Sequence, residues 1–105
     1  MKYLKEFTEA IHNKTKLKIT YHADKYGGEI TRLCAPMDVK SSAVSKDNTP
    51  KFHFWDYEGS KGKHVTSKLS ESISSLETTS IPFNPSEFVS WNTNWGISRD
   101  WGEFS

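Results

Sequence analysis

Alternating apolar and polar residues mark one early segment of the chain as a strand. Residues 16–23, KLKITYHA, place Leu17, Ile19 and Tyr21 on one face, with polar side chains between them. Successive side chains of a strand point to opposite faces. The pattern therefore predicts a strand with one buried face and one exposed face.

The next segment predicts a tight turn and a return strand. DKYGGE supplies two glycines that tolerate positive φ, and EITRLCAP at 29–36 pairs back. We expect Pro36 to end this strand, because proline cannot donate to a central ladder. A third strand through Val39 and a loop at 45–50 follow.

The segment KFHFWDY, residues 51–57, predicts a strand most strongly, because β-forming aromatics crowd it. Phe52 and Phe54 point to one face, and we expect them in the core. The other face carries His53, Trp55 and Tyr57. Either protein chain or a ligand covers this second face.

The loop EGSKGK and the strand HVTSKL complete a hairpin. Symmetric closure predicts the pairs Tyr57–His64, Trp55–Thr66 and His53–Lys68. The inner face then also carries Val65, Ser67 and Leu69. A slip of one residue would exchange the two faces.

Helical spacing is confined to short stretches. Residues 2–13 place Leu4, Phe7 and Ile11 on one stripe, which predicts an amphipathic helix that docks on an apolar surface. SESISSLE predicts a single helical turn, with Ser70 as N-cap and with Ile73 and Leu76 on its inner side. Two prolines then exclude a helix, so TTSIPFNPSEFV is extended or turning.

The C-terminal segment is unusually aromatic. Trp91 and Trp95 share a face if SWNTNWG forms a helical turn, and Trp101 extends the apolar surface. Burying such residues is worth roughly 2–3 kcal/mol each. In one interpretation the segment folds over its own domain. In the other it docks on a second copy or a partner protein, with Arg99 at the rim.

This order of elements predicts a mainly β (α+β) single domain over residues 1–105. Short antiparallel strands with tight turns favour a small barrel, which removes exposed sheet edges. We expect a helix at 1–14, the barrel at 15–80 and an aromatic extension at 81–105.

Charge changes this picture little. The net charge is +1, so no global signal for nucleic acid exists. Residues 1–68 hold 13 Lys/Arg and 8 Asp/Glu, net +5, whereas residues 69–105 hold 1 Arg and 5 acids, net −4. Either an acidic tail screens a basic surface, or the split is a chance distribution of solvated charges.

Cysteine usage and hydropathy suggest a compartment. Cys34 is the single cysteine, which excludes an intrachain disulfide and fits a reducing environment. We interpret it as an inert buried thiol. No apolar run reaches the length of a membrane span, and the first residues do not read as a signal peptide. We expect a cytoplasmic protein.

Three stretches of the chain together resemble the WYL domain family. IHNKTKLKITYHADKYGGEITRLCAP is similar to the family's opening, from an apolar helix end to an Arg strand that ends in Pro. FHFWDY is similar to the strand that names the family, with Phe52, His53 and Phe54 where Trp, Tyr and Leu are usual. LSESISSLE is close to the family's Leu–acid–x–Ile ending. The resemblance covers about residues 10–80.

The resemblance implies a five-stranded SH3/Sm-like antiparallel barrel that senses a nucleotide or oligonucleotide in a basic groove. Such domains usually follow a DNA-binding helix-turn-helix in transcription regulators, whereas only one short helix precedes the barrel here. The basic strand is also weak, with Lys63, His64 and Lys68, and with Ser72 where a basic residue is common.

The candidate ligand site combines aromatic rings, on which bases stack, with cations that phosphates need. Its residues are Arg32, His53, Trp55, Tyr57, His64 and Lys68. The alternative is that the helix or the tail covers Trp55 and Tyr57. Candidate partner-binding residues are Trp91, Trp95, Arg99 and Trp101.

The four histidines lack metal-ligand spacing, and no serine or cysteine pattern predicts a nucleophile. We therefore expect no metal, no cofactor and no enzymatic activity. The leading hypothesis is a ligand-sensing or nucleic-acid- and nucleotide-binding regulatory module. The alternative is a protein-interaction module that dimerises or docks a partner through its C-terminal tryptophans.

Overall fold

The structure is a computed structural model that describes residues 2–41, 49–58 and 64–105. The elements are the helix α1 (Leu4–Asn13) and the strands β1 (Thr15–Ala23), β2 (Gly28–Ser41), β3 (Pro50–Asp56), β4 (His64–Lys68) and β5 (Ile73–Pro82). Short 3₁₀ turns lie at Asp24–Tyr26, Ser70–Ser72, Pro85–Glu87 and Gly102–Phe104. The predicted loops at 45–50 and 58–63, with Lys63, lie largely outside the described residues.

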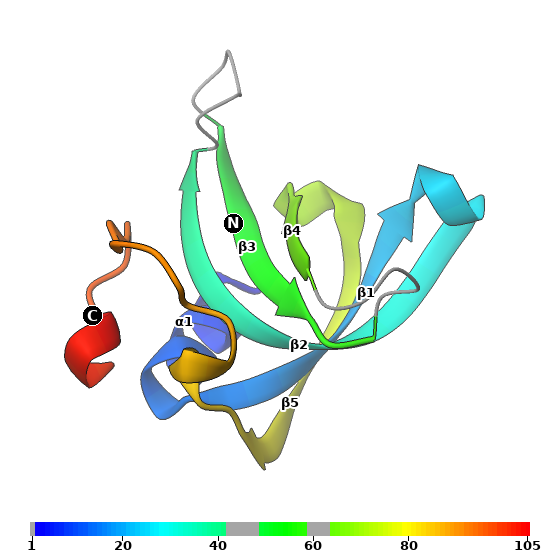
Figure 1. Ribbon diagram of the computed structural model, residues 1–105. Coiled ribbons are helices and arrows are strands. Elements are labelled where there is room, and N and C mark those ends of the chain that lie inside the picture. Colours follow the sequence, from blue (N-terminus) through cyan, green and yellow to red (C-terminus); the bar gives the residue numbers. More distant parts are fainter. Residues whose placement is uncertain (1, 42–48, 59–63) are drawn as a thin grey trace.

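The strands form one antiparallel sheet in the order β4-β3-β2-β1-β5, so the predicted mainly β fold with an N-terminal helix is confirmed. Figure 1 shows the sheet curling strongly, with α1 and the C-terminal segment on the same side of the molecule. β4 and β5 are its edges, and closure into a barrel stays a prediction. No helix among the described residues is long and apolar enough to cross a membrane.

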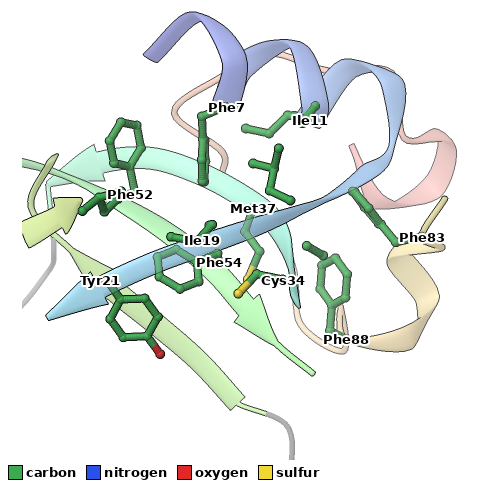
Figure 2. Packing of buried hydrophobic residues seen from close by; sticks show 14 of the residues in the cluster. Phe7, Ile11, Ile19, Tyr21, Cys34, Met37, Phe52, Phe54, Phe83 and Phe88 are labelled. Carbon is green, nitrogen blue, oxygen red and sulfur yellow. The ribbon is translucent and has the colours of Figure 1, made fainter. Parts of the chain in front are cut away.

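Opposite faces of β3 define two sides of the sheet. The inner face carries Phe52 and Phe54, both 0 % exposed, as predicted. Figure 2 shows Phe7 and Ile11 pointing from α1 toward this core, and the rings of Phe7 and Phe52 lie 4.7 Å apart. The outer face carries His53 and Trp55, because side chains alternate along a strand.

α1 is shorter than predicted. It begins at Leu4, and Lys14 follows it in the left-handed region at φ 55°. Its apolar stripe buries Phe7 and Ile11, and this burial stabilises a helix that is marginal alone.

The prediction that Pro36 ends a strand is wrong. β2 continues through Pro36 and takes in Val39, which the sequence assigned to a separate strand. The pairing of β2 with β1 ends at Cys34, and the ladder with β3 shifts register between Pro36 and Asp38. Proline is accepted here because it lies beside a bulge, past the end of one neighbouring strand.

The predicted hairpin register is wrong by one residue. The observed pairs are Phe52–Lys68, His53–Ser67, Phe54–Thr66, Trp55–Val65 and Asp56–His64. Directly opposed residues share a face, so Thr66 and Lys68 lie on the inner face. Val65 and Ser67 therefore lie on the outer face, contrary to the prediction.

The helical turn predicted over SESISSLE is wrong, and the turn considered for SWNTNWG is absent. Only Ser70–Ser72 forms a short 3₁₀ turn, its N-cap is Leu69, and Ile73 already belongs to β5. SWNTNWG is not helical, although the rings of Trp91 and Trp95 lie 6.1 Å apart in an edge-on contact. In both places strand pairing or aromatic packing outweighs a weak local helical preference.

The C-terminal segment, residues 83–105, folds back over its own domain. Phe88 stacks on Trp55 at 5.7 Å, with 24° between the ring planes. Trp101 is 3 % exposed, and its indole N–H donates to the Ile11 carbonyl at 2.9 Å. Both faces of β3 are thus packed against protein, which explains the aromatic residues on both.

Candidate binding site

A groove of about 170 Å³ lies between the outer face of the sheet and the C-terminal segment. Its walls are Met37, Asp38, Lys40, His53, Val65, Trp91, Asn94 and Trp95. Val65 and Trp91 are each 44 % exposed at its rim. Apolar walls with a few polar groups are typical of sites for small ligands.

Asp38 holds the C-terminal wall of the groove in place. Its side chain is 1 % exposed. One carboxylate oxygen accepts from the backbone N–H of Gly96 at 2.8 Å, and the other accepts from that of Ile97 at 3.0 Å. The Arg99 guanidinium forms an ion pair with it at 3.2 Å. A buried carboxylate needs such partners, because an unpaired buried charge is costly.

Arg99 fixes the same wall from the other side. Its side chain is fully buried and also donates to the backbone carbonyls of Met37 and Ile97. The guanidinium carbon lies 4.0 Å from the ring centroid of Trp95 and 4.3 Å from that of Trp101. Burial lowers the pKa of Arg99 to about 10, although Asp38 opposes this shift. Arg99 is therefore an internal cation at neutral pH.

Gly96 permits the close approach of the C-terminal segment to β2. An added Cβ would lie 3.0 Å from the Lys40 Cβ and 3.1 Å from the Val39 carbonyl oxygen. We expect Gly96→Ala to lower the free energy of unfolding by about 1–3 kcal/mol through overpacking, as measured by urea denaturation. Gly28→Ala is the matched control, because nothing lies within 4 Å of its added Cβ. Equal stability of the two variants would contradict this packing.

His53 has a defined tautomer at the floor of the groove. Its Nε2 donates to the Lys40 carbonyl at 2.9 Å, because a carbonyl can only accept. Its Nδ1 lies 2.7 Å from the Ser67 hydroxyl, which donates to it when the ring is neutral. Both ring nitrogens are thus occupied, and His53 presents its ring rather than a free base to a ligand.

Lys40 supplies the cation of the groove. Its exposed ammonium donates to the Asn94 carbonyl at 2.9 Å, and an ammonium has two further donors. The groove therefore combines half-exposed Trp91 with a cation at the same opening. A flat aromatic ring and an anionic group are the complementary ligand features.

The six predicted ligand residues do not form one site. Only His53 lines the groove, and Trp55 lies under Phe88 on the same outer face. Arg32 and Lys68 are on the inner face, by their pairing with Ile19 and Phe52. Lys68 was predicted on the outer face because the predicted hairpin register was wrong by one residue. The side chain of His64 lies outside the described residues.

Tyr57 is held by charged side chains rather than left for a ligand. Its hydroxyl donates to Glu87 at 3.3 Å, and the Lys16 ammonium lies 4.2 Å from its ring centroid. Burial, followed by the charge of Glu87, raises the pKa of Tyr57 well above its usual range. Tyr57 is part of the contact between the C-terminal segment and the sheet.

The predicted partner-binding residues divide by exposure. Trp91 is half-exposed and Trp95 is partly buried, whereas Arg99 and Trp101 are internal. In this fold the internal pair contacts the chain's own domain, as the first interpretation of the segment expected. Only Trp91 and part of Trp95 face the groove.

The described residues contain no group of three or more metal-ligating side chains. Cys34 is fully buried, as predicted, and burial followed by the charge of Asp56 raises the pKa of its thiol. A thiol in such surroundings is a poor nucleophile, because the thiolate is the reactive form.

Sequence reasoning missed five of the eight residues that line the groove. Asp38, Lys40 and Asn94 carry no local signal, because their role depends on contacts across more than fifty residues. Val65 was placed on the wrong face by the register error.

Comparison of the chain with family models, with curated proteins and with solved structures finds no match. The resemblance to WYL domains stays a prediction.

Proposed function

We propose that the protein is a non-enzymatic module that binds a nucleotide, or a similar small aromatic anion, in the groove beside Trp91. The observation that carries the proposal is the pairing of a half-exposed tryptophan with the Lys40 cation in a cavity of about 170 Å³. Base stacking on an aromatic residue is worth roughly 1–3 kcal/mol. A cation beside it selects a ligand that carries phosphate.

Three features of the groove support this class of ligand. Met37, Val65 and Trp95 give it apolar walls that suit a ring. The Asp38 carboxylate is saturated by its own partners, so it does not repel an anion as an unpaired charge would. Its size suits one ring system rather than a long polymer segment.

Calorimetric titration with AMP, GMP and UMP tests the proposal. We expect saturable binding that weakens as salt rises, because a phosphate is held by a lysine. Trp91→Ala should weaken binding roughly 5- to 100-fold, which corresponds to one stacked base. Lys40→Gln should weaken nucleotide binding and remove much of its salt dependence, while weak binding of the uncharged nucleoside is unchanged.

Lys5→Gln is the matched control, because Lys5 is an exposed lysine on α1 away from the groove. It should bind like the parent chain. Absence of saturable binding by every nucleotide at low salt would overturn the proposal, as would equal binding by the Trp91 and Lys5 variants. Thermal melting of each variant is the control for an intact fold, and we expect melting temperatures close to that of the parent chain.

The exposed apolar rim favours a second candidate function, docking of a protein partner or a second copy. Val65 on β4 and Trp91 are both 44 % exposed beside the groove. Sedimentation of the parent chain and of Trp91→Ala over a range of concentrations tests the dimer form. A dimer that Trp91→Ala dissociates supports this candidate, whereas a monomer at every concentration excludes its dimer form.

The proposal places this module in the cytoplasm. The single cysteine is a buried free thiol, which fits a reducing compartment. Exposure of Cys34 to a thiol reagent in the native protein, measured against denatured protein, should show strong protection.

A further inference from the structure

The inner face of the sheet holds polar groups whose hydrogen bonding is incomplete. Among the described residues, the Arg32 Nε and the Thr66 hydroxyl are buried without a hydrogen bond of ordinary geometry. Lys68 takes part in none of the ion pairs of these residues. Arg32 and Thr66 supply buried donors, which are rare without acceptors in folded proteins, whereas Lys68 is partly buried.

The strand register brings these donors to the same side as the core. Arg32 lies opposite Ile19, and Thr66 lies opposite Phe54. Lys68, two residues after Thr66, projects from the same face of β4. The cluster is therefore separated by the sheet from the groove beside Trp91.

Tyr21 is the neighbour that these side chains share. Its ring lies 5.3 Å from the Lys68 ammonium and packs edge-on against Phe54 at 5.4 Å. The Thr66 hydroxyl, as a hydrogen-bond donor toward Tyr21, and the Arg32 charge each act to lower the pKa of Tyr21. Burial, followed by the charge of Asp56, raises the pKa of Tyr21 to about 12, so its hydroxyl keeps its proton at neutral pH.

Asp56 does not satisfy the whole cluster. One of its oxygens accepts from the Glu58 backbone N–H at 2.7 Å. The other lies 3.5 Å from the Arg32 Nε, close enough for an ion pair but without a formed hydrogen bond. Asp56 thus balances the charge of Arg32, whereas no ion pair among the described residues engages Lys68.

We propose that Arg32, Thr66, Lys68 and Tyr21 form a binding site for an oxyanion, either a carboxylate or a phosphate group. Such a group supplies several acceptor oxygens and one or more negative charges, which matches donors gathered around Tyr21 and an ammonium that no ion pair among the described residues engages. The Asp56 carboxylate favours an anion of low charge. This site is independent of the proposed function of the groove.

Titration of ¹⁵N-labelled protein with inorganic phosphate and with acetate, at fixed pH and ionic strength, tests the site. We expect saturable shifts of the amide signals of Arg32, Thr66 and Lys68 with at least one of the two anions. The two titrations distinguish phosphate from carboxylate. Thr66→Val and Lys68→Met should each weaken binding roughly tenfold or more, as loss of a charge-assisted hydrogen bond does.

The variants are chosen to keep the fold. Valine has the shape of threonine, and methionine keeps the apolar stem of lysine. Lys18→Met, an exposed lysine of β1, is the matched control and should bind like the parent chain, as should Trp91→Ala. Absence of saturation with both anions would overturn the proposal and leave water as the partner of the buried donors. Unchanged binding by both inner-face variants would overturn it as well.

Discussion

Asp38→Ala is expected to lower the free energy of unfolding by about 3–5 kcal/mol, the cost of breaking a buried ion pair from one side. The substitution leaves the Arg99 guanidinium buried without its carboxylate. It also removes the acceptor of the Gly96 and Ile97 backbone N–H groups. Urea denaturation followed by tryptophan fluorescence measures the effect.

Two controls separate this anchor from a general effect of charge. Asp24→Ala removes a carboxylate that is 97 % exposed and should change stability by no more than about 1 kcal/mol. In the Asp38→Ala background, Arg99→Met should cost less than it does alone, because the charge it removes no longer has a partner. Additive losses in the double variant would show that the two residues are not coupled.

The same substitution carries information on the groove. Asp38 holds the segment that brings Trp91 and Trp95 over the outer face of the sheet. Loss of nucleotide binding in Asp38→Ala, at a temperature where the variant remains folded, is the expected consequence. Retained binding would place the ligand elsewhere on the protein.

Trp101→Ala is expected to destabilise the protein by about 3–5 kcal/mol through the cavity that it leaves. Trp101 is 3 % exposed and lies edge-on to Phe83 and Phe88 at 5.6 and 6.2 Å. The substitution also removes the hydrogen bond from the Trp101 indole to the Ile11 carbonyl, which ties the C-terminal segment to α1. A domain of ordinary stability, about 5–15 kcal/mol, is severely weakened by such a loss.

Trp91→Ala is the matched control, since it removes the same side chain from a half-exposed position. Its cost should stay below that of Trp101→Ala by about 2 kcal/mol or more. Comparable and small effects of the two variants would mean that the C-terminal segment is not packed on its own domain. The comparison thus tests directly which of the two interpretations of the aromatic tail holds.

Period-two alternation was sufficient to predict the central sheet. Leu17, Ile19, Phe52 and Phe54 are all fully buried, as their alternation indicated. Every second side chain of a strand points to the same face, so the buried positions can be read directly from the sequence. The helical stripe of α1 was likewise found from the spacing of apolar residues, although the helix begins at Leu4 and not at the predicted residue 2.

The candidate site depends on the strand register and on a bulge, which the spacing of apolar residues in the sequence does not reveal. A hairpin can slip by one residue without changing the alternation of either strand, and the slip moves Thr66 and Lys68 to the inner face. The bulge that carries β2 past Pro36 is likewise decided by its partner strands.

The sequence by itself determined the class of fold, the principal buried residues and the need of the aromatic tail for a partner surface. Only the tertiary structure decided which surface that is, because the partners of Asp38 and Trp101 lie roughly sixty and ninety residues away. Contacts of that range are selected by the packing of the whole domain, where hydrogen-bond partners of a buried carboxylate must all be supplied at once.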